Sequence, residues 1–311
     1  MREADGAGGG SAAASLGRRF GPYFALDVLT AVRLDADGPS SSAPSASGPS
    51  SSGSAATGLP ADSSGLPASG SAASGPPAGW SAVADLADPR TGAFARRADT
   101  VRAALAAAGG VEVGAVDERV AVSVAQLGVC ARLVAPALAL AVVTGRSPAL
   151  RLDRVFWQDL LGGPFPLAVD GPPALGDAAG TEETASARLA RGLADGVLVA
   201  VVAPFVAAVE REHPVSSKIL WGNVASGLAG AAKMIGLAEP AAAGRAWGVV
   251  AAMCAQEGPL RGAGGLVAPG RFRRRSCCLI YRLAERPGDR AAPPGALCED
   301  CVLHLRRPAA R

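Results

Sequence analysis

Four cysteines near the C-terminal end are the residues of this chain best suited to chemistry. They form the pattern C-C-x19-C-x2-C, at Cys277, Cys278, Cys298 and Cys301. Four thiolates gathered in so short a stretch are a common way of holding a structural zinc ion or an iron–sulfur cluster. The pattern therefore predicts a metal centre or a redox site.

The spacing within each pair helps to choose the metal. Cys298 and Cys301 lie one turn apart if their segment is helical, so they can bind one ion together. Cys277 and Cys278 are adjacent, and neighbouring side chains of an extended strand point to opposite faces. Both thiolates converge only if the backbone is irregular. A zinc ribbon avoids this by spacing its ligands, whereas the two irons of a [2Fe–2S] cluster spread the thiolates over a larger body.

The spacing thus favours a [2Fe–2S] cluster, and a zinc site, a redox disulfide and a chance grouping are the alternatives. His304 follows Cys301 by three residues and could replace a thiolate, in a Rieske-like site or in a zinc site of three thiolates and one imidazole. The simpler interpretation is that His304 terminates a short helix. Cys130 and Cys254 lie in apolar helical stretches, and we expect them to be buried packing residues.

The segments around the cysteines carry a family resemblance. Residues 277–283 (CCLIYRL) and 297–303 (LCEDCVL) resemble the C-terminal signature of the FhuF-type ferric siderophore reductases. Residues 217–226 (SKILWGNVAS) are similar to that family's L-W-G-N-x-x-S stretch, and residues 163–167 (GPFPL) to a segment of its actinobacterial branch. The family's spacer has ten residues and this one has nineteen. Lengthening a flexible loop that much costs only about 0.6 kcal/mol.

The resemblance implies an oxidoreductase with a [2Fe–2S] cluster on the four cysteines. It would pass one electron to siderophore-bound Fe(III), because hard oxygen ligands hold Fe(III) far more tightly than Fe(II). The alternatives are a zinc-stapled structural or binding protein and a [2Fe–2S] electron carrier without siderophore turnover. We find no G-x-G-x-x-G after a strand, no P-loop and no H-E-x-x-H. Electrons are therefore expected from an external donor such as a ferredoxin or a reductase.

Two further groups of residues are candidates for support or docking. In the helix predicted upstream, Trp221, Asn223 and Ser226 would support the cluster or line the siderophore site, or would simply pack the helix. Gly222 and Ser226 would permit the close approach of another helix or of the cluster loop. Arginines precede the first cysteine pair and would raise the reduction potential of a cluster or receive an anionic partner. The alternative interpretation is that these arginines form an ordinary solvated basic run. The arginines are Arg271, Arg273, Arg274 and Arg275.

Composition bears on the compartment more than on partners. The net charge of +3 argues neither for nor against nucleic acid, and we expect no such partner. The first thirty residues lack the layout of a signal peptide. The longest apolar runs, 133–145 and 196–208, are too short to span a bilayer, so no transmembrane segment is predicted. We expect a cytoplasmic protein, or one held peripherally at the inner face of the membrane.

The elements that position these residues are expected to be mainly α with minor β. A segment at 1–37 should dock on the body through Phe20, Tyr23, Phe24 and Leu26, and residues 38–79, nearly all Ser, Ala, Gly and Pro, are typical of a disordered insertion. Residues 80–270 form the helical body, and 271–311 the cluster-binding segment.

Within the body, helices are predicted at 117–143, at 216–235 and from Pro240 to near Gly258, and Pro136 divides the first. Residues 150–157 and 165–169 flank Gly162-Gly163 and predict a β-hairpin.

Overall fold

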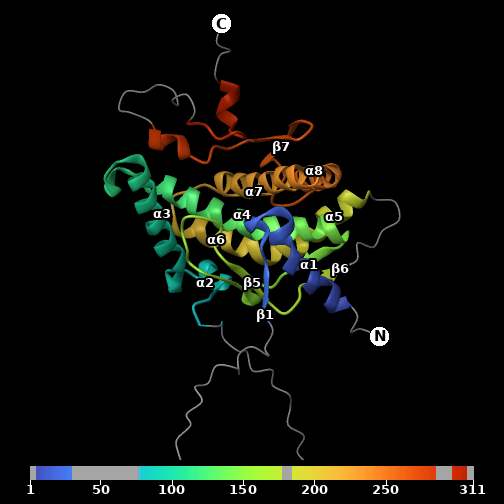
Figure 1. The fold of residues 1–311 in the computed structure, drawn as a ribbon. Coiled ribbons are helices and arrows are strands. Elements are labelled where there is room, and N and C mark those ends of the chain that lie inside the picture. Colours follow the sequence, from blue (N-terminus) through green and yellow to red (C-terminus); the bar gives the residue numbers. More distant parts are fainter. Residues whose placement is uncertain (1–4, 30–75, 77, 177–183, 285–295, 307–311) are drawn as a thin grey trace, which may run out of the picture.

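The chain folds into a helical body capped by a small cysteine-bearing segment (Figure 1). The computed structural model describes residues 5–29, 76, 78–176, 184–284 and 296–306. Helices dominate these residues and the sheets are small, so the predicted fold class, mainly α with minor β, is confirmed.

The helices are α1 (Asp5–Phe20), α2 (Val83–Ala87), α3 (Ala93–Gly109), α4 (Glu118–Thr144), α5 (Ala185–Leu193), α6 (Ala203–Glu212), α7 (Ser217–Ala238) and α8 (Pro240–Ala255). The strands are β1 (Asp27–Leu29), β2 (Ser81–Ala82), β3 (Ser147–Ala149), β4 (Val155–Trp157), β5 (Leu167–Asp170), β6 (Ala174–Gly176), β7 (Gly264–Ala268) and β8 (Arg271–Arg274).

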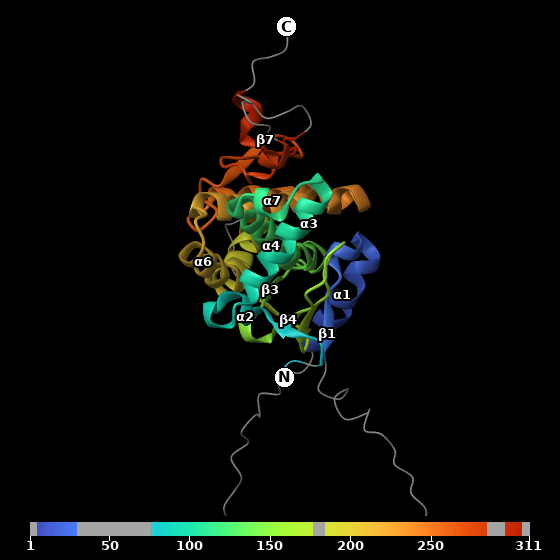
Figure 2. The same cartoon turned by 90° about the vertical axis from the view of Figure 1, so that its left-hand side faces the viewer.

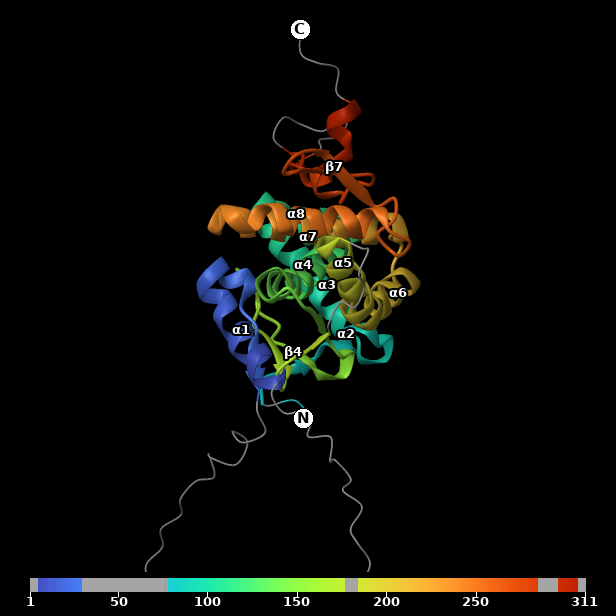
Figure 3. The same ribbon diagram turned by 90° about the vertical axis from the view of Figure 1, so that its right-hand side faces the viewer.

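Helix α4 is the central element of the body. It packs along α7 and also contacts α1, α3 and α8, and its side chains are buried along most of its length. The three views agree that α7 and α8 lie between the body and the C-terminal segment, with the four-stranded sheet on the far side (Figures 1, 2 and 3). The cysteine segment therefore rests on a helical platform.

The four-stranded sheet has the order β1-β5-β4-β2. Strands β4 and β5 pair antiparallel, with Val155 opposite Val169 and Trp157 opposite Leu167. The predicted hairpin is thus confirmed, with strands shorter than expected. Strand β1 pairs parallel with β5, which joins the start of the chain to the body.

The N-terminal segment is held by burial and by one arginine. Phe20, Phe24 and Leu26 are buried, whereas Tyr23 is 50% exposed. From α4, the buried Arg132 donates hydrogen bonds to the carbonyl oxygens of Phe165 (2.8 Å), Tyr23 (3.1 Å) and Ala25. Burial lowers the pKa of Arg132 to about 10. Of the predicted insertion at 38–79, all but residues 76, 78 and 79 lies outside the described residues.

Proline does not divide the central helix as predicted. Pro136 lies inside the single helix α4. An interior proline costs about 3 kcal/mol or more because it removes a hydrogen bond and crowds the preceding turn. The flanking residues Leu133, Val134, Ala137 and Leu138 are almost fully buried, and their burial keeps the helix continuous.

Among the residues that the structure describes, two helical stretches are long and apolar enough, by length and composition, to cross a membrane. They are α4 and the continuous stretch Ala185–Glu212, which joins α5 to α6 through the π-helix Ala194–Val202. In the structure 72% and 56% of their apolar windows are buried inside the protein, a pattern that core helices share. The expectation that neither crosses a membrane stays a prediction.

Close contact between α4 and α7 gives a stability prediction. A Cβ on Gly227 would lie 2.9 Å from the Cα of Ala131, whereas one on Gly230 would meet nothing within 4 Å. We expect Gly227→Val to lower the free energy of unfolding by about 1–3 kcal/mol through overpacking. Gly230→Ala should raise it by about 0.5–1 kcal/mol through helix propensity. Urea denaturation measures the free energy of unfolding of both variants. A Gly227→Val variant as stable as Gly230→Ala would contradict the tight α4–α7 contact.

Candidate metal centre

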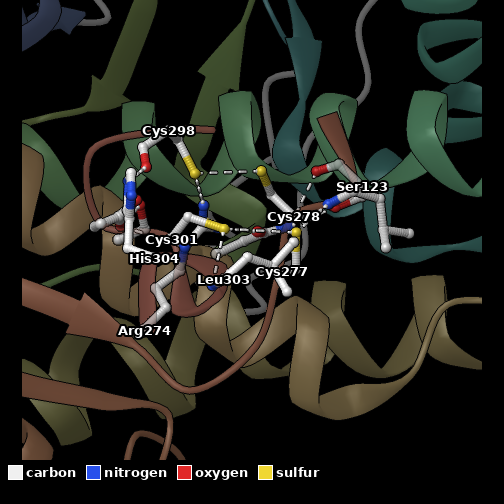
Figure 4. Close-up of polar contacts among 12 residues, drawn as sticks. Ser123, Arg274, Cys277, Cys278, Cys298, Cys301, Leu303 and His304 are labelled. Carbon is white, nitrogen blue, oxygen red and sulfur yellow. Dashed lines mark hydrogen bonds and ion pairs between the residues drawn. The ribbon is translucent and has the colours of Figure 1, made fainter. Parts of the chain in front are cut away.

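The cysteines lie in two irregular segments, one after β8 and one before the short helix Val302–Arg306, and their side chains face one another (Figure 4). Strand β8 ends at Arg274, and Cys277 and Cys278 follow in a loop before the short helix Ile280–Ala284. Leu279 has φ of 70°, a left-handed conformation that is unusual for a branched side chain. The irregular backbone expected after the adjacent cysteines is therefore present. The spacer residues 285–295 lie outside the described residues.

The four sulfur atoms form two close pairs. Cys278 Sγ lies 3.7 Å from Cys298 Sγ, and Cys277 Sγ lies 3.8 Å from Cys301 Sγ. A tetrahedral metal with metal–sulfur bonds of about 2.3 Å separates two of its thiolates by about 3.8 Å. Each pair therefore has the separation of two ligands on one metal. All four residues are free thiols in the structure, so neither pair is a disulfide.

The two pairs adjoin each other, because the thiols of Cys277 and Cys278 also hydrogen-bond. Among the described residues, no three His, Cys, Asp or Glu side chains are gathered so that they could hold one metal ion. A zinc site made of four cysteines needs all four sulfurs at mutual tetrahedral distances. The two sulfur pairs, at 3.7 Å and 3.8 Å, each supply one such distance.

Each sulfur is approached by an N–H donor. The backbone N–H of Leu279 donates to Cys277 Sγ (3.3 Å), and that of Leu303 donates to Cys301 Sγ (3.5 Å). The backbone N–H of Ile280 hydrogen-bonds to Cys278. Cys298 Sγ accepts from the side chain of Arg274 at 2.7 Å. Hydrogen bonds of this kind stabilise thiolates and, in metal centres, orient them.

Arg274 is the buried cation of the site. Its side chain is 1% exposed, and besides Cys298 it reaches Asn223 Oδ1 at 2.9 Å. Its Nε forms an ion pair with Asp300 Oδ2 at 3.3 Å, and its backbone N–H donates to the Asp300 carbonyl at 2.9 Å. Burial alone lowers the pKa of Arg274, but the negative charges of Cys278, Asp300 and Cys298 raise it above the ordinary value.

A hydrogen-bond network anchors Arg274 to two helices. Asn223 of α7 is fully buried, and its Nδ2 donates to Ser123 O (3.0 Å), Ser123 Oγ (3.1 Å) and Gln126 Oε1 (2.9 Å) of α4. Gln126 in turn donates to Cys130 Sγ at 3.0 Å. Because the donors and acceptors of the Asn223 amide are all used, its oxygen is held in place for Arg274.

The site favours one thiolate over its neighbours. Hydrogen bonds from Cys277 and Cys298, together with the charge of Arg274, lower the pKa of Cys278 far below its ordinary value. The pKa values of Cys277 and Cys298 are raised because these thiols hydrogen-bond to Cys278 and are partly buried. Cys278 is therefore the cysteine among these three whose thiolate the site stabilises most.

The other predicted residues fall on both sides of the cysteine segment. Ser226 Oγ donates to Asp300 Oδ2 at 2.5 Å, and Arg273 lines a pocket beside it. Trp221 and Arg275 line a second pocket, next to Ser276. Of the upstream residues, Asn223 alone touches Arg274, and of the arginines, Arg274 alone touches a cysteine sulfur.

His304 and the other two cysteines lie away from the four sulfurs. His304 Nε2 is 3.0 Å from the carbonyl oxygen of Cys298, so its ring meets backbone rather than a thiol pair. Cys130 and Cys254 are buried in helices, as expected. Burial raises the pKa of Cys254 to about 11 and that of Cys130 further, which makes both thiols unreactive.

Sequence reasoning missed Asp300, Ser123 and Gln126, and it did not separate Arg274 from its neighbours. The alternation of inward and outward side chains along β8 could have singled out Arg274. Phe272 is buried, and in a strand residue 274 shares its face, so Arg274 points inward while Arg273 does not. Ser123 and Gln126 give no such signal, because their contact with Asn223 depends on how α4 packs on α7.

Comparisons with known proteins give no family for this chain. A scan against protein-family models and a search of curated proteins each found no match.

Arg274 is predicted to stabilise the folded protein strongly. Arg274→Met leaves Asp300 and Asn223 Oδ1 without their buried partner, and we expect the free energy of unfolding to fall by about 3–5 kcal/mol. Arg271→Met, on the exposed face of the same strand, should change it by less than about 0.5 kcal/mol. Chemical denaturation of the two variants tests this, and similar small losses would show that the buried contacts contribute little.

Proposed function

We propose that this protein is a ferric siderophore reductase that carries one [2Fe–2S] cluster on Cys277, Cys278, Cys298 and Cys301. The observation that carries the proposal is the grouping of the sulfurs into two pairs, at 3.7 Å and 3.8 Å. Two irons with two thiolates each require two such pairs. In this assignment Cys278 and Cys298 hold one iron, and Cys277 and Cys301 hold the other.

The donor set supports iron–sulfur ligation over a structural zinc. A zinc site of four cysteines draws all its thiolates around one ion, and the described residues offer no group of three. A thiolate-only set in which every sulfur accepts an N–H is suited to an iron–sulfur cluster, whose potential depends on such hydrogen bonds. When bound, the cluster supplies a one-electron reductant.

Residues around the cysteines would then set the reduction potential of the cluster. Arg274 brings a fixed positive charge and an N–H to Cys298 Sγ, and both favour extra negative charge on the sulfurs. Asn223 fixes the guanidinium from the platform side and Asp300 from the loop side. Cys277 and Cys298 are half-buried, whereas Cys278 and Cys301 are buried. A partner at the surface would therefore exchange electrons over the shortest distance through Cys277 or Cys298.

The substrate follows from coordination chemistry and from the family resemblance. Siderophore oxygen ligands bind Fe(III) much more tightly than Fe(II), so one electron releases the metal without a general acid or base. The resemblance of residues 217–226, 277–283 and 297–303 to the FhuF-type reductases supports this substrate class. The electron donor is a separate protein, such as a ferredoxin or a reductase, and the setting is the cytoplasm or the inner face of its membrane.

Metal content and spectra test the proposal. Protein purified anaerobically should contain about two irons and two acid-labile sulfides per chain, and dithionite should give a spin-half EPR signal. Cys298→Ser should lose most of the iron, because it removes one of the two ligands of its pair. Cys254→Ser is the matched control, a cysteine outside the site, and should retain the iron.

Turnover tests the reductase activity separately. Reduced protein mixed with a ferric siderophore should be reoxidised in step with the appearance of Fe(II), trapped by an Fe(II)-specific chelator. A colourless protein with one zinc that takes up no cluster on anaerobic reconstitution would sink the proposal. An intact cluster that is not reoxidised by any ferric siderophore would restrict the protein to electron transfer.

A further inference from the structure

A basic pocket lies directly beside the first cysteine pair. Its volume is about 270 Å³, and it is formed by the first turn of α7, the loop before β7 and the residues that follow β8. The residues that matter for its chemistry are Lys218, Trp221, Arg261, Arg275 and Ser276. Ser276 is bonded through the chain to Cys277, so an occupant of this pocket adjoins the candidate centre.

The charges of this pocket are of one sign. Lys218, Arg261 and Arg275 line it, and no carboxylate does. Arg261 pairs with Glu257, which lies outside the lining. Neither Lys218 nor Arg275 has an ion-pair partner in the part of the chain that the structure describes. Glu210 accepts from the backbone N–H of the lining residue Ser217 at 3.2 Å and is not part of the lining. Two cations thus remain free for a ligand.

The hydroxyl of Ser276, a residue of the pocket lining, is buried. Ser276 Oγ is buried and has no hydrogen-bond partner within the described ranges. It fits there because residue 222 is glycine, since a Cβ at that position would lie 2.1 Å from Ser276 Oγ. The hydroxyl therefore packs against α7 and is closed to a ligand in the pocket. Trp221 supplies the apolar wall.

We infer that this pocket binds the ferric complex and selects chelates with net negative charge, such as tris-catecholates, over neutral tris-hydroxamates. Anionic oxygens of one chelating arm accept from Lys218 and Arg275, and the arm packs on Trp221. The pocket is smaller than the roughly 300–1,000 Å³ of a typical drug-sized site, so the rest of the complex stays outside. This inference rests on the proposed function for the identity of the ligand as substrate.

The other pocket beside the cysteines is less suited to an anion. It also presents cations, Lys233, Arg271 and Arg273, but Glu299 and Asp300 line it too. Lys233 is already paired with Glu299 at 2.5 Å. The opposed charges cancel much of the attraction for a negatively charged complex.

Binding is measured with gallium complexes, because Ga(III) resembles Fe(III) in size and charge and is not reduced under these conditions. Calorimetric titration of the full-length protein with trianionic Ga(III) tris-catecholate should give an affinity at least about tenfold higher than with neutral Ga(III) tris-hydroxamate. The difference should shrink as salt screens the charges. Lys218→Ser and Arg275→Ser should each weaken tris-catecholate binding by about tenfold.

Controls are available within the chain. Arg151→Ser makes the same change in net charge at an exposed residue paired with Asp153 and should leave binding unchanged.

Lys218 and Lys233 are the only lysines, so an amine-reactive label read by mass spectrometry compares the two pockets in one sample. The tris-catecholate complex should protect Lys218 and leave Lys233 reactive. Lys218 and Arg275 are exposed, so their variants should fold, which circular dichroism checks.

Equal affinity for the two gallium complexes, or protection of Lys233 in place of Lys218, would overturn the inference even if the protein contains a [2Fe–2S] cluster. Selective binding with Lys218 protected would support it even in a protein that proved to hold zinc. Failure of the proposed function and failure of this inference are therefore distinguishable.

Discussion

The buried guanidinium of Arg274 is the interaction on which the rest of the site depends. One side chain contacts a sulfur of the second cysteine pair, a carboxylate from the loop between Cys298 and Cys301, and an amide of the helical platform. A buried charge is tolerated only when its partners are in place, so loop, strand and platform must assemble together. The cysteine loops have little regular structure of their own, and this ionic contact fixes their position on α7.

Packing beneath that contact is equally constrained. Asn223 reaches both Arg274 and α4 because small residues let the layers approach, with Gly222 under Ser276 and Gly227 against Ala131. Helix α7 therefore contacts both the cysteine segment and the central helix α4, and a shift of α7 would disturb both contacts. Two pockets formed by described residues adjoin this segment, and they differ in charge.

Sequence and structure agree most where the chemistry is local. The irregular backbone after Cys277-Cys278, the hairpin of β4 and β5 and the helical character of the body follow from residue type and spacing. The pairing of Cys278 with Cys298 and of Cys277 with Cys301 could not be predicted, because it depends on how two loops approach in space. The prediction that Pro136 divides the helix was wrong for a related reason. The sequence shows the cost of a proline inside a helix, but not the burial of its neighbours, which offsets that cost.

The position of the cysteines along the chain also bears on biosynthesis. Ser123, Gln126 and Asn223 all precede Arg274 and the four cysteines, so the ribosome releases the platform before the metal ligands appear. Domains generally begin to fold from the N-terminal side during synthesis. Cys298 and Cys301 are thus synthesised after the residues of α4 and α7 that hold Arg274 in place.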